Sequence, residues 1–245
     1  MHVGIGETAG QCCCPQLTRP GVVCQLPLNG ITGMWPERAY LPHVPDNAAV
    51  PNYTFQRGPV VPLITTERLI LRAWKNEDVL PYAEMNADPR VREFFPSVLT
   101  REQSEAEVRR LQAIHDKDGF CMFAAELTET GTFVGFIGLL RMTFAVPSTA
   151  QPAVEIGWRL SHKYWGKGLA TEGARGTVRY AFEALKLDEI VAITVPVNVR
   201  SRRVMEKIGM KHLPELDFDH PGVPVGHPLR PHVLYALKRD SYLKY

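Results

Sequence analysis

The sequence predicts a mixed α/β fold in which one sheet carries helices on both faces. Three observations indicate this class. Strand-like apolar runs and amphipathic helical segments follow one another in the order β-α-α-β-β-β-α-β-α-β. Two adjacent strands are joined by a short turn, as in a β-hairpin, whereas a helix connects two later strands. The 245 residues are 45% hydrophobic and 22% charged, as is typical of a globular chain.

Regular patterning starts at Leu63, with a strand and two helices. TERLILRAW has the apolar content of a strand, and NEDVLPYAEMNA predicts a helix capped by Asn76 with acidic residues in its first turn. The second helix begins with a capping box formed by Thr100 and Gln103 and stops at Gly119.

The remaining elements are five strands and two helices. FCMFAAEL and TFVGFIGLL form a hairpin through the turn TETG, and VEIGWRL is the next strand. LATEGARGTVRYAFEAL predicts a helix, and DEIVAITVP predicts the strand after it. NVRSRRVMEKIG predicts a short helix that ends at Gly209, and HVLYALKRD is the last strand.

The first 62 residues differ in composition from the rest, which predicts an extension over residues 1–62 and one domain over residues 63–245. Nine of the 20 prolines fall in the extension and interrupt each apolar run before it reaches helix length. Four of the five cysteines lie there too, namely Cys12, Cys13, Cys14 and Cys24. They lack the spaced CxxC pair and following histidine pair of a zinc site. We therefore expect a poorly ordered extension and no metal.

Charge and hydropathy argue against several classes of partner. The formal net charge is +2, from 28 Lys and Arg against 26 Asp and Glu, so no overall attraction to nucleic acid or to an anionic membrane is expected. No apolar run reaches the roughly 20 residues of a membrane span, and the first residues lack the pattern of a secretory signal. The sequence therefore predicts a cytoplasmic protein.

The stretch YWGKGLATEG, from Tyr164 to Gly173, places three glycines at the start of a predicted helix. Glycines at a helix N-terminus let several backbone N–H groups point into one cavity, which predicts an anion-binding site. A Rossmann GxGxxG fingerprint fails because its third position is Thr171. The P-loop pattern fails because Ala174 and Arg175 stand where Lys and Ser or Thr are required.

HKYWGKGLATEG, followed about thirty residues later by NVRSRRVMEKIGM, resembles the acyl-CoA motif and the next helix of the GNAT N-acetyltransferase superfamily. The resemblance covers Leu63 to Tyr245 and is closest to the RimJ- and RimL-like branch of ribosomal-protein N-terminal acetyltransferases. In the family pattern Q/R-x-x-G-x-G/A, Gly168 and Ala170 fit, and Trp165 replaces the first polar residue. The resemblance implies a mostly antiparallel GNAT-like sheet and acetyl-CoA as co-substrate without a metal.

The resemblance also implies where acetyl-CoA binds. Its pyrophosphate requires N–H donors and a helix dipole, which the glycine segment is expected to supply. The strands VEIGWRL and DEIVAITVP are expected to splay, so that the pantetheine arm bonds to exposed backbone, whose N–H groups also stabilise the oxyanion. The expected positions are Trp158, Arg159, Leu160, Trp165, Gly166, Lys167, Gly168, Leu169, Ala170 and Thr171.

Glu155 is the candidate general base that takes a proton from the attacking amine. It lies in an otherwise apolar strand before the cofactor loop, where burial raises the pKa of a carboxyl group toward neutrality. A structural glutamate, held by a cross-strand arginine or by backbone amides, explains this position equally well. Glu172 lies in the first turn of the next helix and is expected to favour the helix dipole.

The helix NVRSRRVMEKIG lacks the tyrosine that many GNAT enzymes offer to the CoA thiolate, so Ser201 is the candidate hydroxyl there. A helix cap or a cofactor hydrogen bond is the alternative role for Ser201. By resemblance, Asn198 bonds to the pantetheine or orients the loop, with strand-end capping as the alternative. Arg203 and Lys207 are expected to meet the CoA phosphates, and a solvated basic face is the alternative.

Two segments are expected to form the acceptor mouth, DPRVREFFPSVLT and DFDHPGVPVGHPLRPH. Asp217 and Asp219 of the second segment are expected to attract a cationic amine. The same segment carries His220, His227 and His232, whose irregular spacing gives no metal-ligand geometry.

The sequence therefore predicts an N-acetyltransferase that moves an acetyl group from acetyl-CoA to a primary amine by direct attack. The expected acceptor is a peptide or protein N-terminus, and a small amine or antibiotic is the alternative. A non-catalytic acyl-CoA-binding module is the main hypothesis from another class, and a nucleotide-binding enzyme is disfavoured by the failed glycine motifs.

Overall fold

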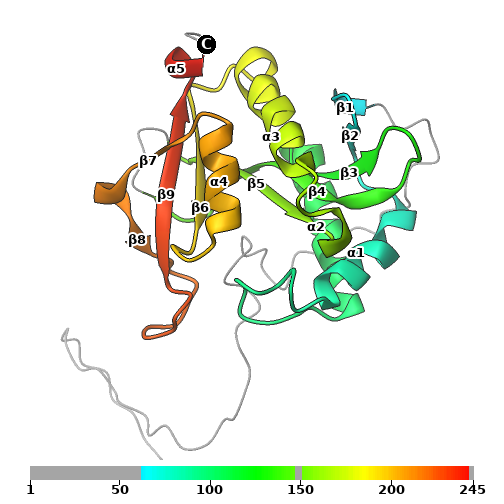
Figure 1. Ribbon diagram of the computed structural model, residues 1–245, viewed down its shortest axis with the longest axis horizontal. Coiled ribbons are helices and arrows are strands. Elements are labelled where there is room, and N and C mark those ends of the chain that lie inside the picture. The colour runs from blue at the N-terminus through cyan, green and yellow to red at the C-terminus, as the bar shows by residue number, and fades with distance from the viewer. Residues whose placement is uncertain (1–61, 147–150, 243–245) are drawn as a thin grey trace, which may run out of the picture. The chain divides into compact units, whose positions relative to one another are not determined.

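The computed structural model describes residues 62–146 and 151–242. Within these residues nine strands form a sheet in the order β1-β2-β3-β4-β5-β6-β9-β7, and β8 pairs with β9 (Figure 1). The strands are β1 Pro62–Thr65, β2 Leu69–Arg72, β3 Met122–Leu127, β4 Phe133–Arg141, β5 Val154–Leu160, β6 Glu189–Thr194, β7 Lys211–His212, β8 Phe218–Asp219 and β9 Pro231–Lys238. The predicted extension lies outside the described residues except for Pro62.

The main helices lie between the strands in the predicted order. They are α1 Val79–Ala87, α2 Arg101–Asp118, α3 Leu169–Arg179 and α4 Val199–Lys207, followed by the short C-terminal α5 Arg239–Tyr242. Shorter helical turns are η1 Asn76–Asp78, η2 His162–Tyr164, η4 Pro214–Leu216 and the π-helical η3 Tyr180–Ala184. The predicted mixed α/β class is confirmed.

Antiparallel pairing holds throughout the described sheet except between β5 and β6. These two strands run parallel, and Glu155 of β5 lies opposite Val191 of β6. Because α3 lies between them in the chain, they form a strand-helix-strand unit inside an otherwise antiparallel sheet.

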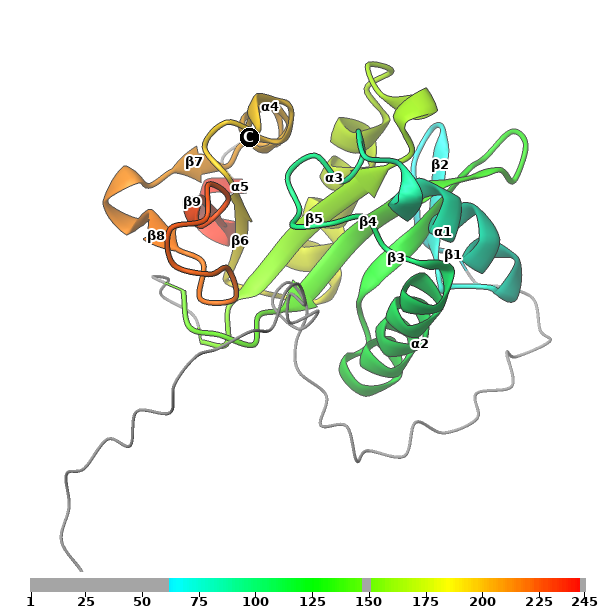
Figure 2. The same cartoon turned by 90° about the horizontal axis from the view of Figure 1, so that it is seen from below.

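Two neighbouring residues of β4 show that helices cover both faces of the sheet, because successive side chains of a strand point to opposite faces. The ring of Phe136 lies 6.2 Å from the ring of Tyr82 on α1. Ile137, on the other face, packs under α3, where a Cβ atom added to Gly173 would collide with its Cδ1 atom. Figure 2 shows this division, with α1 and α2 on one side of the sheet and α3 on the other.

The helix α2 follows its sequence signals at both ends. Gln103 N–H donates to Thr100 Oγ1 at 3.2 Å, and Thr100 N–H donates to the Gln103 side chain at 2.7 Å. Gly119 ends the helix in the left-handed region, with φ +77°. The predicted capping box and stop are confirmed.

Two local predictions need correction, and two short strands were not predicted. The segment before η1 forms a hairpin of β1 and β2 instead of a lone strand. Asn76 does not cap the first helix, because it lies within η1 and the Asp78 carboxylate accepts the Lys75 N–H at 2.7 Å. The strands β7 and β8 have two residues each, which is too short for a periodic pattern, and both form by pairing with β9.

A buried ion cluster joins β2, β3 and η1. The Arg72 guanidinium donates two hydrogen bonds to Asp78, at 2.7 and 2.9 Å, and one to Glu126 at 2.5 Å. The Arg72 and Asp78 side chains are each only 3% exposed. A buried charge that loses its partner has neither water nor a counter-ion, so the cluster depends on each of its members.

We predict that Asp78→Ala lowers the free energy of unfolding by about 3 to 5 kcal/mol, because it leaves the Arg72 guanidinium buried and underpaired. The matched control is Asp88→Ala, which breaks the exposed pair of Asp88 with Arg90 at 2.7 Å and is expected to cost much less. Urea denaturation followed by circular dichroism measures both variants. Equal losses would contradict a stabilising role of the buried cluster.

Candidate active site

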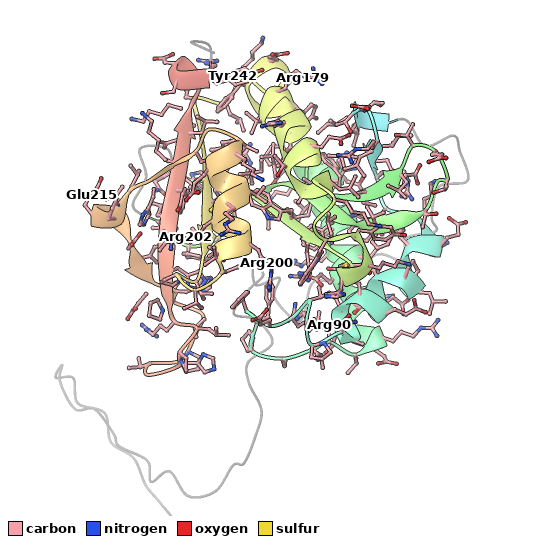
Figure 3. All side chains as sticks on the ribbon, in the orientation of Figure 1. Arg90, Arg179, Arg200, Arg202, Glu215 and Tyr242 are labelled. Atoms are coloured by element: carbon pink, nitrogen blue, oxygen red, sulfur yellow. The ribbon has the colours of Figure 1, made fainter. Side chains whose placement is uncertain are left out.

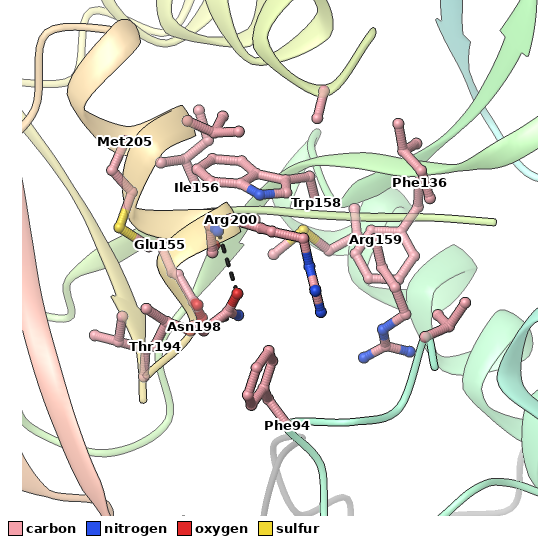
Figure 4. Close-up of a pocket in the computed structure, with 18 of the residues that line it drawn as sticks. Phe94, Phe136, Glu155, Ile156, Trp158, Arg159, Thr194, Asn198, Arg200 and Met205 are labelled. Carbon is pink, nitrogen blue, oxygen red and sulfur yellow. Dashed lines mark hydrogen bonds between the residues drawn. The ribbon is translucent and has the colours of Figure 1, made fainter. Parts of the chain in front are cut away.

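A cavity of about 500 Å³ opens where β5 and β6 separate (Figure 4). This volume is in the range of small-molecule sites. Its walls come from β5, the turn that starts α3, the end of β6, α4 and the segment between α1 and α2. The segments predicted to bind the cofactor and the first of the two predicted mouth segments therefore meet at one cavity.

The strand β5 presents a free backbone edge to this cavity. Among the described residues, β5 and β6 pair only near the start of β5, at Glu155. N–H and C=O groups of alternating residues point to opposite edges of a strand. Because the Arg159 carbonyl oxygen lies against Gly135 of β4, the backbone groups of Trp158 and Leu160 face the gap. The splay implied by the resemblance is present.

The glycine turn before α3 forms one end of the cavity. Gly166 and Gly168 have φ values of +73° and +78°, which other residues rarely adopt. A Cβ atom at Gly166 would meet nothing within 4 Å, and one at Gly168 would meet only Arg68 Nη2 at 3.5 Å. The first helical bond runs from Glu172 N–H to the Gly168 carbonyl, so the N–H groups of the three residues between them have no helical acceptor. The turn is an open set of amide donors.

Glu172 fastens this turn to the sheet. Its carboxylate accepts hydrogen bonds from Thr66 Oγ1 at 2.7 Å, from Arg68 N–H at 2.8 Å and from Arg68 Nε at 2.6 Å. Arg68 also donates to the Lys167 carbonyl at 3.0 Å. Desolvation acts to raise the pKa of Glu172, but the bonds from Thr66 and Arg68 outweigh it and lower that pKa. Beyond the predicted dipole interaction, Glu172 is a tertiary contact that holds the N-terminus of α3.

Trp165 supports the free edge of β5. Its Nε1 donates to the Leu160 carbonyl at 2.7 Å, and its ring lies 4.6 Å from the Arg200 guanidinium carbon. Arg200 also forms an ion pair with Glu93, in the segment between α1 and α2. Figure 3 shows Arg200 pointing toward the segment that carries Arg90. The indole N–H of Trp165 therefore has its hydrogen-bond acceptor within the protein. Arg200 connects the two sides of the cavity mouth.

Asn198 joins the end of β6 to the start of α4. Its side-chain oxygen accepts the Ser201 N–H at 3.2 Å, drawn as a dashed line in Figure 4. Its amide nitrogen donates to Thr194 Oγ1 at 3.0 Å. Asn198 is therefore the N-cap of α4, and its predicted contact with the pantetheine stays a prediction. The Ser201 side chain lines the cavity beside this cap.

The basic side chains of α4 point in two different directions. Arg203 and Lys207 lie one helical turn apart and both line the cavity. Arg202 faces away, because its guanidinium donates to Tyr235 Oη and to the Pro196 carbonyl, each at 3.1 Å. The two expected phosphate contacts, Arg203 and Lys207, therefore border the cavity, and their role in binding the CoA phosphates stays a prediction.

Glu155 lies half-buried in the cavity wall (Figure 4). No described residue forms a hydrogen bond or ion pair with its carboxylate, so the arginine or amide partner considered as an alternative is not seen among them. Desolvation by burial raises the pKa of Glu155 to about 7. Both the protonated and the ionised carboxyl are therefore populated near neutral pH.

The Arg159 side chain is a cavity feature that the sequence analysis missed. Arg159 was expected to act through its backbone, but its guanidinium carbon lies 4.3 Å from the Phe95 ring centroid and 5.0 Å from that of Phe136. It donates from Nη1 to Asn86 Oδ1 at 3.0 Å. Strand alternation was a usable signal, since it places the side chains of Arg159 and Glu155 on the same face of β5.

The second mouth segment also differs from expectation. Asp217 and Asp219 bond to a histidine and an arginine of the same part of the chain, and neither of these two described residues lines the cavity. His220 and His232 do line it, with ring centroids 4.9 Å apart. Burial lowers the pKa of both, that of His220 to about 4. This wall therefore presents uncharged imidazoles where acids were expected.

Comparison with known proteins defines the class of the molecule. Residues 68–211, more than half of the chain, match the acetyltransferase (GNAT) domain, and the chain belongs to that family. It is therefore an acetyl-CoA-dependent acyltransferase with the GNAT fold. The resemblance to the RimJ- and RimL-like branch stays a prediction.

Individual relatives agree with this assignment. A GNAT-family acetyltransferase from Bacillus anthracis is 30% identical, with a TM-score of 0.60 over 72% of this chain and 98% of that one. The FsC-acetyl coenzyme A-N(2)-transacetylase of Aspergillus fumigatus is 37% identical in an alignment that covers 46% of this chain and about half, 52%, of that enzyme. The aminoglycoside acetyltransferase AAC(6')-Ib, solved with coenzyme A, shares the fold at 19% identity and a TM-score of 0.59, over 72% of this chain and 98% of that one.

The described residues lack two features that would indicate a membrane or a metal. None of their helices combines the length and apolar character needed to cross a bilayer. No group of three or more His, Cys, Asp or Glu side chains is arranged to hold a metal ion among them. The cysteines of the predicted extension lie outside this part of the chain.

We predict that Glu155→Gln becomes more stable relative to the wild type as the pH rises from about 5 to 8. The folded-state pKa of about 7 lies above the ordinary 4.5, so the stability that protonated Glu155 contributes is complete at acid pH and is lost as the pH rises through 7. Full ionisation corresponds to a cost on the order of 3 kcal/mol, which the neutral amide avoids.

Thermal denaturation across this pH range measures the difference between variant and wild type. The control is Glu84→Gln on the exposed surface of α1, for which we expect a flat difference. A flat difference for Glu155→Gln as well would contradict a carboxyl that titrates near neutrality.

Proposed function

We propose that the chain acetylates a primary amine by direct attack of the amine on bound acetyl-CoA, with Glu155 as the general base. The observation that carries this proposal is the separation of β5 and β6. It brings a free strand edge, an open glycine turn and a carboxyl group without a partner among the described residues to one cavity. Each of these three features has a separate task in acyl transfer.

The glycine turn fits the pyrophosphate of acetyl-CoA. Its amides have no helical acceptor, the space where a Cβ atom would stand is open, and the α3 dipole favours negative charge at this end. We assign the pyrophosphate to Gly166, Lys167, Gly168, Leu169, Ala170 and Thr171. Arg203 and Lys207 are assigned to the outer phosphates, because they line the same cavity. The backbone of Trp158 and Leu160 is assigned to the pantetheine arm.

Bound acetyl-CoA supplies an activated acetyl group and a thiol leaving group. The free edge of β5 orients the thioester, and an N–H group of that edge offers a hydrogen bond to the oxygen that gains negative charge. The amine nitrogen forms the new C–N bond as the C–S bond breaks. Glu155 accepts the proton that the amine loses, and its pKa of about 7 suits a base near neutral pH. Ser201 is the candidate to relay a proton from water to the thiolate, which needs only modest help because a free thiol has a pKa of roughly 8.5.

Two kinds of acceptor follow from the resemblances. The RimJ- and RimL-like motif favours a peptide or protein N-terminus. A small amine is the second kind, and the name of the Aspergillus relative specifies transfer to a nitrogen, the N(2) position. A panel of peptide N-termini and small amines, incubated with acetyl-CoA and assayed for free thiol, tests the proposal. Release of thiol without formation of an acetylated amine would contradict it.

We predict that Glu155→Gln lowers kcat/KM by about 10²-fold at neutral pH, because it keeps the shape of the side chain and removes the proton acceptor. The loss is expected to shrink as the pH approaches the pKa of the amine, where the free amine needs no base. A pH-rate profile of both proteins measures this, with Glu84→Gln as the control. A loss that is the same at all pH values would show that Glu155 acts in binding or structure.

We predict that Gly168→Ala weakens acetyl-CoA binding by about tenfold or more, because a Cβ atom enters the open turn and redirects its amides. The matched control is Gly131→Ala in the β3–β4 turn, where φ is +65° and no atom lies within 4 Å of the added carbon. Both variants carry a similar backbone strain of about 1 kcal/mol. Isothermal titration calorimetry measures affinity. An equal affinity of both variants for acetyl-CoA would contradict the assignment of the pyrophosphate to this turn.

A further inference from the structure

The Arg159 side chain is a partly buried cation in the wall of the cavity. It lies between the rings of Phe95 and Phe136, at 4.3 and 5.0 Å from their centroids. Its Nε atom is buried and has no hydrogen-bond partner among the described residues. The one hydrogen bond to a described residue runs from Nη1 to the neutral amide of Asn86. Asn86 is itself held by Ser104 Oγ at 3.1 Å, so it fixes the orientation of the guanidinium without balancing its charge.

The charges around Arg159 do not cancel among the described residues. Glu107 is a carboxylate that lines the same cavity, and it accepts a hydrogen bond from Tyr82 Oη at 2.6 Å. Glu107 also lies close enough to Arg110 to interact with its charge. No described residue forms an ion pair with Arg159 itself. A partly buried cation without an ion-pair partner among the described residues favours binding of an anion.

Arg159 and Glu155 share one face of β5, with only Gly157 between them on that face. At about 3.3 Å per residue, their Cα atoms are about 13 Å apart along the strand. The floor between them is apolar, because the Met122 thioether lies where a Cβ atom of Gly157 would stand. The face therefore presents a carboxyl group, an apolar stretch and a guanidinium in a row.

We propose that the acceptor is an aminocarboxylate, with its amine at Glu155, an apolar segment over Met122 and its carboxylate bound by Arg159. The planar fork of a guanidinium matches the two oxygens of a carboxylate. One unbalanced positive charge suits a monoanion. A polycationic acceptor meets repulsion at the same point. This assignment rests on the proposed acetyl transfer and on Glu155 as the base, and it names the substrate class of that site.

The test uses a homologous series of ω-amino acids, from glycine to 6-aminohexanoate, each paired with its primary amide. The two members of a pair have the same amine and differ in the charge at the far end. With acetyl-CoA and the full chain, we expect kcat/KM for the best acid to exceed that of its amide by about 10- to 100-fold, from one charge-assisted contact. We expect the longer members to show this preference more strongly than glycine.

Arg159→Met is expected to reduce the acid-to-amide ratio to about one, and Arg159→Lys to restore part of it. The control is Arg90→Met, since Arg90 also lines the cavity but is exposed and paired with Asp88, so the ratio is expected to persist. Acetyl-CoA affinity of each variant, measured by calorimetry, separates acceptor effects from cofactor effects.

The outcomes separate the two proposals. If the wild type acetylates amines but treats acids and amides alike, the carboxylate site is wrong and the acetyl-transfer proposal stands. An acid preference that survives in Arg159→Met also overturns the assignment to Arg159. If the wild type acetylates none of these compounds and no other amine of the panel, the proposed function itself fails.

Discussion

The single parallel contact between β5 and β6 is the constraint on which the rest of the site depends. Every other pairing in the described sheet is antiparallel and continues along its strands, but these two strands meet at Glu155 and then separate. The separation leaves backbone donors and acceptors of β5 without strand partners, and buried backbone groups of this kind require a ligand or water. An extended, amide-containing chain such as pantetheine satisfies them as a strand would.

Several contacts fix the elements that border the gap. The Glu172 clamp with Thr66 and Arg68 fixes the N-terminus of α3 to the first hairpin. Asn198 fixes the start of α4 to the end of β6. The indole N–H of Trp165 donates a hydrogen bond to one carbonyl of the free edge of β5. Because each contact joins elements on one side of the gap, none of them pulls β5 toward β6.

The sequence was sufficient to predict those parts of the structure that depend on residues close together along the chain. The capping box of α2, the β3–β4 hairpin and the glycine turn are signalled within a few residues, and all three are present. Contacts between distant residues were not predictable. Glu172 meets Thr66 across 106 positions, and Arg159 meets Asn86 across 73. Such contacts depend on how helices pack on the sheet, which periodicity along one segment does not specify.

The charges of the cavity follow from how deeply each group is buried. Desolvation holds the pKa of Glu155 at about 7 and lowers that of His220 to about 4, so both groups are wholly or partly uncharged near neutral pH. An arginine does not respond in this way, because a guanidinium keeps its proton at any physiological pH. Arg159 is therefore a cation on the same face of β5 as a carboxyl group that is only partly ionised near neutral pH. Burial thus raises the pKa of Glu155 into the range of a general base. The Arg159 guanidinium keeps its positive charge and is available to an anionic group of a molecule that enters the cavity.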